Sequence, residues 1–412
     1  MRVFQKKQVG KRQALKRQIL LIAVITLVIC CLFTGCRSSG DKEDAGATKA
    51  TEQTQARQES TTQVDNDQLL ATLFFASDYQ KVEGLPTPAE NLAAIMASAG
   101  ADGIDPDRVV LCGDYTNDRN LHDYQISPED SIAEIRSLTR EAFPDVEDED
   151  MTFVQGNHDK MTDSITETGL HEYDDYLIYV LNTQEDFPWK QGKVSGCLDK
   201  VKKSSSDMKK CFDELIADKE KRPVFIAGHV PLHFTARTSS RHTTGDNLYS
   251  SLIFDVVNEA GKNLDIIYLY GHDHSKGWDC YMGGGCVYKG KGETLLIPRF
   301  KESDVNTDEF TEETLSFTYL NAGYVGYYMN CGPEEYDAGR AGEYEAADGT
   351  MTGTTFRIYP NRVEIGRYDK DGVHVLGAAG AADPYKGGID KGLIGEEHYS
   401  VETGTGETVQ RR

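Results

Sequence analysis

Residues 264–274 read LDIIYLYGHDH, an apolar run that ends in a glycine and then in two histidines separated by one aspartate. A short run of β-branched and aromatic residues before a glycine predicts a buried strand. His272 and His274 therefore follow the carboxyl end of a strand, which is where open α/β sheets bind ligands. Similar endings follow earlier strands of the chain, and together they indicate the fold.

Four earlier apolar runs also end in residue types that bind metals. The runs LFFAS, RVVLC, MTFVQ and PVFIA lead, in this order, to Asp78, Asp114, Asn157 and His229. Each ending alone is typical of a turn or a surface histidine. Carboxylate, amide and imidazole groups at five successive strand ends instead predict a shared metal centre.

Helical patterns alternate with these strands, which favours layers of sheet and helix over a helical bundle. Helices are expected at residues 88–100, 127–143, about 197–220 and 247–261, and antiparallel strands after residue 290. No internal repeat is present.

The expected ligands contain carboxylate, amide and imidazole groups but no thiolate, which suits Mn, Fe, Zn or Co. They are too many for one tetrahedral ion and about right for two divalent ions that share a bridging ligand. Such a pair, about 3.5–4 Å apart, contacts both the attacking and the leaving oxygen of a displacement at phosphorus. The pattern predicts two metal cofactors and a phosphoester substrate.

The segments DYQ, GDYTND, GNHD, GH and GHDH, in this order, resemble the calcineurin-like metallophosphoesterases, whose pattern is DxH, GD, GNH(D/E), GH and GHxH. The resemblance covers about residues 67–375. It implies an α/β fold (an α+β sandwich) with two β-sheets flanked by helices, and a phosphomonoesterase or phosphodiesterase activity.

The resemblance also implies a role for each matching residue. The first ion would be held by Asp78, Gln80, Asp114 and His274, and the second by Asp114, Asn157, His229 and His272. A hydroxide between the ions would attack phosphorus. His158 would protonate the leaving oxygen or stabilise its charge, and Asp159 would orient His158 by accepting its other N–H.

Gln80 departs from the family pattern, which has histidine at that position. An amide oxygen is a weaker ligand than imidazole for zinc-like ions. The first ion could bind loosely, it could be an oxygen-preferring ion such as Mn or Fe, or Gln80 could stay outside its coordination. The departure also supports an alternative function, a catalytically weakened metal-binding surface protein with a role in binding or adhesion.

Substrate contacts are expected in the polar loop that follows His229. His233, Arg237 and Arg241 lie in this loop, and an arginine can bind phosphate through two parallel hydrogen bonds. The alternative is that these side chains are solvated loop residues.

Residues 1–36 indicate a targeting segment rather than part of the fold. A basic stretch precedes the apolar stretch ILLIAVITLVICCLF and then Cys36. This ending resembles a bacterial lipoprotein cleavage site, although Phe33 stands where that motif prefers leucine. An uncleaved signal anchor is the alternative, and both predict an exported domain tethered to the membrane at the cell surface.

Low-complexity segments flank the domain expected at residues 67–375. Residues 37–66 are polar and predict a disordered linker, and residues 376–412 predict a flexible glycine-rich tail. Cysteine spacing leaves two pairings open, Cys280 with Cys286 and Cys197 with Cys211.

The net charge is −23, although the first 36 residues are basic. The rest of the chain is therefore strongly acidic, and we expect no binding to a nucleic-acid backbone. A thiol enzyme built on Cys112 is disfavoured because no histidine adjoins it in the sequence.

Overall fold

Apolar runs and helical patterns form the elements that their periodicity predicts. The computed structural model describes residues 66–81, 87–116, 127–183, 194–233, 249–272, 288–299, 310–326, 351–373, 398–402 and 410–411. All of them belong to one unit, Gln63–Arg412. The helices are α2 (Thr87–Ala101), α3 (Pro128–Ala142), η1 (Asp148–Asp150), α5 (Val194–Ala217) and α6 (Ser250–Ala260).

Strands make up about half of the remaining described residues. Up to residue 270 they are β1 (Ala71–Ala76), β2 (Arg108–Leu111), β3 (Met151–Phe153), β4 (Gly169–Glu172), β5 (Leu177–Leu181), β6 (Val224–Gly228) and β7 (Ile266–Tyr270). Later strands are β8 (Tyr288–Lys289), β9 (Thr294–Pro298), β10 (Phe310–Thr314), β11 (Thr318–Asn321), β12 (Gly323–Tyr324), β13 (Thr352–Tyr359), β14 (Arg362–Asp369), β15 (Gly372–Val373), β16 (His398–Glu402) and β17 (Gln410–Arg411).

Two main sheets carry the fold. One has the order β17-β16-β14-β13-β1-β2-β3, and the other has the order β4-β5-β6-β7-β11-β8. Strands β1, β2 and β3 run parallel, as do β5, β6, β7 and β11. Strand β13 pairs antiparallel with β1, and β9 and β10 form a separate hairpin. The expected two-sheet architecture is confirmed.

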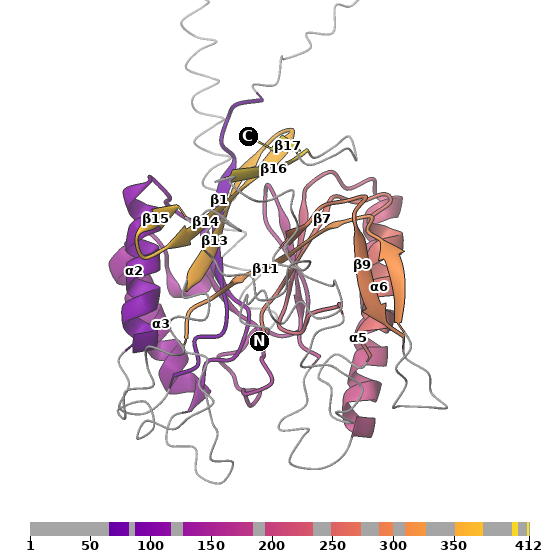
Figure 1. The fold of residues 1–412 in the computed structure, drawn as a ribbon, viewed down its shortest axis with the longest axis horizontal. Helices are drawn as coiled ribbons and strands as arrows, with labels where there is room; N and C mark the ends of the chain where they lie inside the picture. Colours follow the sequence, from indigo (N-terminus) through magenta and orange to yellow (C-terminus); the bar gives the residue numbers. More distant parts are fainter. Residues whose placement is uncertain are drawn as a thin grey trace, which may run out of the picture. The chain divides into compact units, whose positions relative to one another are not determined.

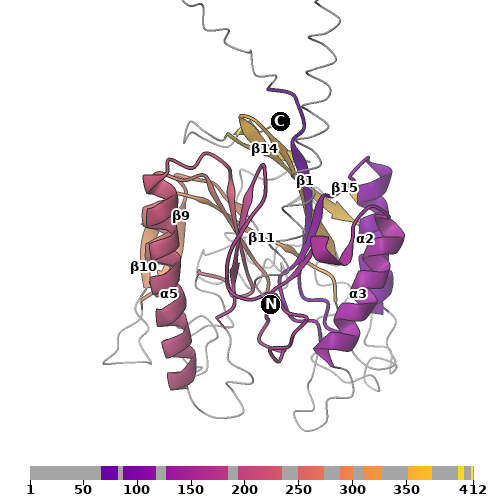
Figure 2. The ribbon, with the colours of Figure 1, turned by 180° about the vertical axis from the view of Figure 1, so that it is seen from behind.

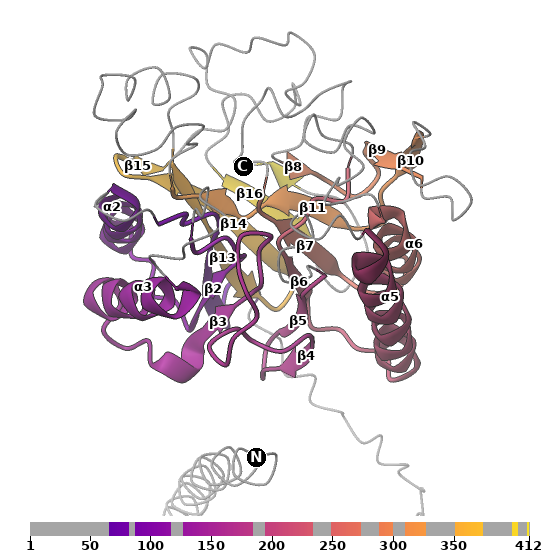
Figure 3. The ribbon, with the colours of Figure 1, turned by 90° about the horizontal axis from the view of Figure 1, so that it is seen from below.

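The sheets pack face to face, with helices on their outer sides. Helices α2 and α3 cover the first sheet, and α5 and α6 cover the second (Figures 1 and 2). Figure 3 shows the same layers from below. Between the sheets lies a buried aromatic cluster, in which the Phe225 ring centroid is 5.9 Å from that of Phe75 and 5.0 Å from that of Phe356. Each central strand is therefore buried on both faces, which explains its continuous apolar sequence.

Helix α3 begins where its sequence predicts. The Ser127 side chain accepts from the backbone N–H of Asp130, whose carboxylate accepts in return from the backbone N–H of Ser127. Pro128 occupies the first helical turn, where its missing N–H costs nothing. Ile132 and Ile135 then lie on the buried face. The capping box and the apolar stripe together fix where α3 begins and which face it buries.

Several expectations need correction. Part of the expected C-terminal tail belongs to the first sheet, because β16 pairs with β14 and β17 pairs with β16. Strand β11 runs parallel to β7, although only antiparallel strands were expected after residue 290. Cys197 and Cys211 both lie in α5, and Cys211 is a free thiol. Fourteen residues of helix separate them by about 21 Å, which excludes a disulfide between the two.

The expectations for residues 1–65 and for Cys280 and Cys286 lie outside the described residues. Within the described part of the chain, no helix combines the length and the apolar character needed to cross a membrane.

Candidate metal centre

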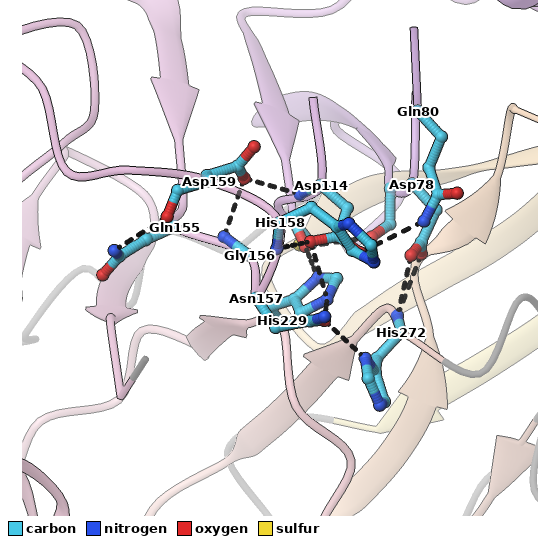
Figure 4. Close-up of polar contacts among 12 residues, drawn as sticks. Asp78, Gln80, Asp114, Gln155, Gly156, Asn157, His158, Asp159, His229 and His272 are labelled. Carbon is cyan, nitrogen blue, oxygen red and sulfur yellow. Dashed lines mark hydrogen bonds and ion pairs between the residues drawn. The ribbon is translucent and has the colours of Figure 1, made fainter. Parts of the chain in front are cut away.

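The expected metal ligands that fall within the described residues lie at the carboxyl ends of strands from both sheets. Asp78 and Asp114 follow β1 and β2 of the first sheet, and His229 and His272 follow β6 and β7 of the second. Asn157 follows β3. Figure 4 shows these side chains pointing toward one another. The site therefore depends on the packing of the two sheets.

An unusual backbone conformation orients several of these residues. Asp78, Gln80, Asp114 and His272 have φ angles of 55°, 50°, 57° and 70°. Among the described residues other than glycine, only Lys219 shares this conformation. Left-handed conformations are strained for such residues and persist where the surroundings impose them. Here the segment after β1 bonds to the segment after β2, since the backbone N–H of Gln80 donates to the carbonyl of Asp114 at 2.8 Å.

Two glycines allow the backbone to approach the centre closely. A side chain at Gly156 would overlap the backbone nitrogen and Oδ1 of Asp114. A side chain at Gly271 would overlap Ser77 Oγ and lie 2.7 Å from Asp78 Oδ2. Glycine is therefore needed before Asn157 and before His272, for space rather than for conformation.

Four buried side chains converge on one point. Asp114, His229 and His272 each offer a ligand atom within 4.8 Å of the others. Asn157 Oδ1 lies 2.9 Å from His229 Nε2 and 2.7 Å from His272 Nδ1. His229 Nε2 is also 3.3 Å from Asp114 Oδ1. Separations of about 3 Å are close to those between ligands of a single ion at 2.0–2.2 Å.

The hydrogen bond of His229 to the backbone shows why this point needs a cation. His229 Nδ1 lies 2.7 Å from the carbonyl oxygen of Cys112, which can only accept, so Nδ1 carries the hydrogen. In the neutral ring, Nε2 then presents a lone pair toward the oxygens of Asn157 and Asp114. Two acceptors that face each other repel unless a proton or a metal ion lies between them. The donor set therefore fits a divalent ion.

The electrostatics agree with a cation at this point. Burial opposes a charge on His229, but the Asp114 carboxylate outweighs it and raises the pKa of His229 to about 10. Burial likewise opposes the ionised form of Asp114, yet His229 and His158 hold the pKa of Asp114 well below its usual range. The pocket is negative and buried, and such pockets bind metal ions in competition with protons.

Asp78 and Gln80 lie beside Asp114 and make different contacts. The Asp78 carboxylate accepts from the backbone N–H of His272 at 2.9 and 3.1 Å. Gln80 Nε2 donates to Asp114 Oδ2 at 3.2 Å. Both side chains are buried. His274, the fourth expected ligand of the first ion, lies outside the described residues.

His158 lies next to the candidate ligands but is more accessible. Its side chain is 26% exposed, whereas that of Asp114 is 1% exposed. Its Nε2 is 3.9 Å from Asp114 Oδ2, and its backbone N–H donates to Asp114 Oδ1 at 2.8 Å. The ring therefore lies near the carboxylate that is expected to bridge the ions and is partly open to solvent.

The Asp159 carboxylate makes contacts that the sequence did not predict. Its carboxylate accepts from the backbone N–H groups of Asp114, Tyr115 and Gly156, at 2.7, 2.9 and 2.9 Å. No contact between Asp159 and the His158 ring is present among the described residues, and His158 Nδ1 is buried without a partner there. Asp159 joins the segments after β2 and β3, because its fully buried carboxylate needs several donors. Burial and the charge of Asp114 raise the pKa of Asp159 to about 7.

The expected substrate contacts are placed in part. His233 is fully buried, its Nδ1 lies 2.9 Å from the Tyr319 hydroxyl, and its ring contacts that of Tyr270. This position is inside the protein and lends no support to a role in substrate binding. Arg237 and Arg241 lie outside the described residues.

The structure adds supporting residues that the sequence did not indicate. Gln155 Nε2 donates to the carbonyl of Asp159 at 3.2 Å, and Gln155 Oε1 accepts from Lys200 at 3.0 Å. On the other side of the centre, Glu134 of α3 accepts from Tyr79 and Lys81. Gln155 could have been suspected because it directly precedes Gly156. Glu134 carries no such signal.

A family model matches the part of the chain that carries these residues. Residues 75–276 match a family model described as calcineurin-like phosphoesterase. A dimetal phosphatase from Danio rerio is 12% identical, with a TM-score of 0.39, and the match covers 74% of this chain and 97% of that one. A conserved uncharacterised protein from Streptococcus pneumoniae, a predicted phosphoesterase, is 11% identical, with a TM-score of 0.26 and coverages of 73% and 91%. No curated protein matches the chain.

Proposed function

Because the chain belongs, through residues 75–276, to the calcineurin-like phosphoesterase family, we propose that it hydrolyses phosphoesters with divalent metal ions bound at the centre. One observation carries the proposal, namely the buried convergence of Asp114, His229 and His272 from both sheets. Asp114 meets there two histidines that lie more than a hundred positions away in the sequence, and burial of these polar side chains without a bound partner would be unfavourable.

The proposed ion ligands follow from the donor atoms. Asp114, Asn157, His229 and His272 would hold one divalent ion. Asp78 and Asp114, with His274, would hold a second ion, and Gln80 donates to the Asp114 carboxylate beside them. Carboxylate, amide and imidazole donors suit Mn, Fe, Zn or Co.

In this proposal the metal ions and His158 have separate tasks. When bound, the ions would neutralise charge on the phosphoryl oxygens and lower the pKa of water at the centre. His158 would donate a proton to the leaving oxygen, because its ring is the partly exposed one beside Asp114. Asp159 would keep the segments after β2 and β3 together through its three backbone contacts.

A substrate assay tests the hydrolase directly. Full-length protein is purified in detergent, stripped with a chelator, reloaded with Mn²⁺ and offered p-nitrophenyl phosphate and bis-p-nitrophenyl phosphate. We expect turnover that requires the metal and that is lost in His229→Ala. Lys209→Ala serves as the control, because this side chain is 63% exposed and lies in α5.

Two results would separate the alternatives. Retained Mn²⁺ without turnover on either ester or on a broad phosphoester panel would favour the metal-binding surface protein. If the folded protein does not retain Mn²⁺, both the hydrolase and the metal-binding surface protein are excluded.

We further propose that residues 1–36 carry the domain across a membrane and tether it there through lipidated Cys36. The basic and apolar pattern of this segment supports the proposal. Incorporation of radiolabelled palmitate in a bacterial host, lost in Cys36→Ser, is the expected result. Membrane association of an unlabelled protein would indicate an uncleaved anchor instead.

A further inference from the structure

The donor atoms of the centre fall into two groups with different surroundings. In the first group, Asn157 Oδ1 and Asp114 Oδ1 face His229 Nε2 at 2.9 and 3.3 Å. The hydrogen of the neutral His229 ring is already used on the Cys112 carbonyl. Their electron pairs would repel one another unless a proton on Nε2 or a metal ion lies between them, and a metal ion that replaces the proton gains all three donors.

The second group contains Asp78 and Asp114 Oδ2, where a side chain of the site itself donates to the carboxylate. Asp78 accepts from the backbone N–H of His272, and Asp114 Oδ2 accepts from Gln80 Nε2. Because a carboxylate oxygen only accepts, the Gln80 amide must present its nitrogen and turn its oxygen away. To act as a ligand, Gln80 would have to break this bond and rotate its amide group.

We infer that the centre binds its two ions unequally. The set Asp114, Asn157, His229 and His272 retains one ion, whereas the set that includes Asp78 and Gln80 holds a second ion only weakly. This inference rests on the proposed function. It goes further in assigning to Gln80 the role of a donor that competes with the second ion for Asp114.

Two physical effects act in the same direction. The second ion must displace the N–H of Gln80 from Asp114 Oδ2, and Gln80 itself can offer at most a neutral amide oxygen in return, beside the other expected ligands. It must also bind beside an ion already present, against like-charge repulsion in a buried site. We expect the two dissociation constants to differ by about tenfold or more, the range over which contacts around a metal site alter affinity.

The inequality has a consequence for activity. A phosphoester brings negative charge to the centre and would favour entry of the second ion, and by linkage that ion would favour substrate binding. Turnover would therefore rise with the concentration of free divalent ions, well above the concentration that fills the tight position.

Metal retention tests the inference without relying on activity. Full-length protein loaded with Mn²⁺ is passed through a desalting column, and its manganese is measured by elemental analysis and by electron paramagnetic resonance. We expect about one ion per chain with the spectrum of an isolated Mn²⁺. For Gln80→His, which removes the amide donor and adds an imidazole, we expect about two ions with the spectrum of a coupled pair.

A matched control tests whether the gain in manganese depends on position 80 or would follow from any added histidine. Gln68→His adds an imidazole at an exposed position away from the centre and should retain about one ion, like the wild type. Circular dichroism of each variant checks that it is folded.

Each alternative result has a distinct meaning. A folded wild-type protein that retains no Mn²⁺ would contradict the proposed function itself. A wild-type protein with two coupled ions after desalting would overturn the inference and leave the proposed function standing. A Gln80→His variant that still holds one isolated ion would also overturn it.

Discussion

At the scale of single residues, the backbone decides which atom of a side chain is offered to the centre. The Cys112 carbonyl takes the Nδ1 hydrogen of His229, so that Nε2 faces Asn157 and Asp114. Contacts of this kind fix the tautomer and the orientation of a ligand. The left-handed conformations of Asp78, Asp114 and His272 aim three further groups at the same place.

His158 provides a prediction at this scale. If its ring protonates the leaving oxygen, His158→Ala should lower kcat by about 10²–10⁴-fold. The loss should be larger for phenyl phosphate than for p-nitrophenyl phosphate, because the poorer leaving group depends more on a proton. Steady-state kinetics with both substrates, at equal Mn²⁺ content, measure the difference.

Manganese content serves as the control for His158→Ala, because the side chain is not an expected ligand. An equal loss for the two substrates would argue against proton donation by His158.

At the scale of elements, helix α3 supports the segment that follows β1. Tyr79 Oη donates to Glu134 at 2.5 Å, and Lys81 forms an ion pair with the same carboxylate. Residues 79 and 81 thus contact the helix, while Asp78 and Gln80 face the centre. Burial and Glu134 raise the pKa of Tyr79 well above its usual range, so that Tyr79 remains a hydrogen-bond donor.

Removal of Glu134 should therefore disturb the centre from a distance. In Glu134→Ala the buried Tyr79 hydroxyl loses its partner, which should lower the free energy of unfolding by about 1–3 kcal/mol. Manganese retention should also fall, since the segment that carries Asp78 loses its support. Urea unfolding and metal analysis measure both effects.

Glu141→Ala is the matched control for Glu134→Ala, because Glu141 is exposed on the same helix. If Glu134→Ala leaves both stability and manganese content unchanged, α3 does not position the segment.

His233, which contacts Tyr270 of β7 and Tyr319 of β11, leads to a prediction about how the free energy of unfolding depends on pH. Burial, with a smaller contribution from Lys289, lowers the pKa of His233 to about 3. In the unfolded chain its pKa is about 6.5, so between these values the unfolded state binds more protons. His233 should therefore lower the free energy of unfolding as the pH falls below about 6.5, by at most about 1.4 kcal/mol per pH unit.

Urea unfolding from pH 7.5 to pH 5 measures this effect as the difference between the wild type and His233→Gln. The glutamine retains polar atoms for the Tyr319 hydroxyl but does not titrate. The variant should show the weaker pH dependence, and parallel curves for the two proteins would contradict the assignment.

At the scale of the whole described unit, the site depends on the packing of one sheet against the other. Phe75 and Phe356 belong to the first sheet and Phe225 to the second, with ring centroids 5.0–5.9 Å apart. This cluster holds the two sheets together beneath the ligand-bearing strand ends. The carboxylates of one sheet can meet the imidazoles of the other only while this packing persists.

Truncation inside the cluster tests this dependence. Phe225→Ala should lower the free energy of unfolding by about 3–5 kcal/mol, because it removes buried surface and leaves a cavity. Leu69→Ala, at a side chain that is 48% exposed, should change stability by less than about 0.5 kcal/mol. Urea unfolding followed by circular dichroism compares the two, and a small loss in Phe225→Ala would show that the sheets do not rely on this contact.

Local sequence patterns predict the order of the strands along the chain and the residue types at their ends. Apolar runs before Asp78, Asp114, Asn157, His229 and His272 predict β1, β2, β3, β6 and β7, and all five strands form. These features are predictable because burial and turn formation act over a few neighbouring residues. The family resemblance follows from the same local segments.

The contacts between distant segments follow from tertiary packing rather than from local patterns. The carboxylate of Asp159 contacts backbone N–H groups rather than His158, Gln80 bonds to Asp114, and Glu134 reaches the centre from a helix. Strand β16 joins the first sheet from a glycine-rich region. Such contacts depend on how two sheets and their helices pack, and no local pattern in the sequence encodes that packing.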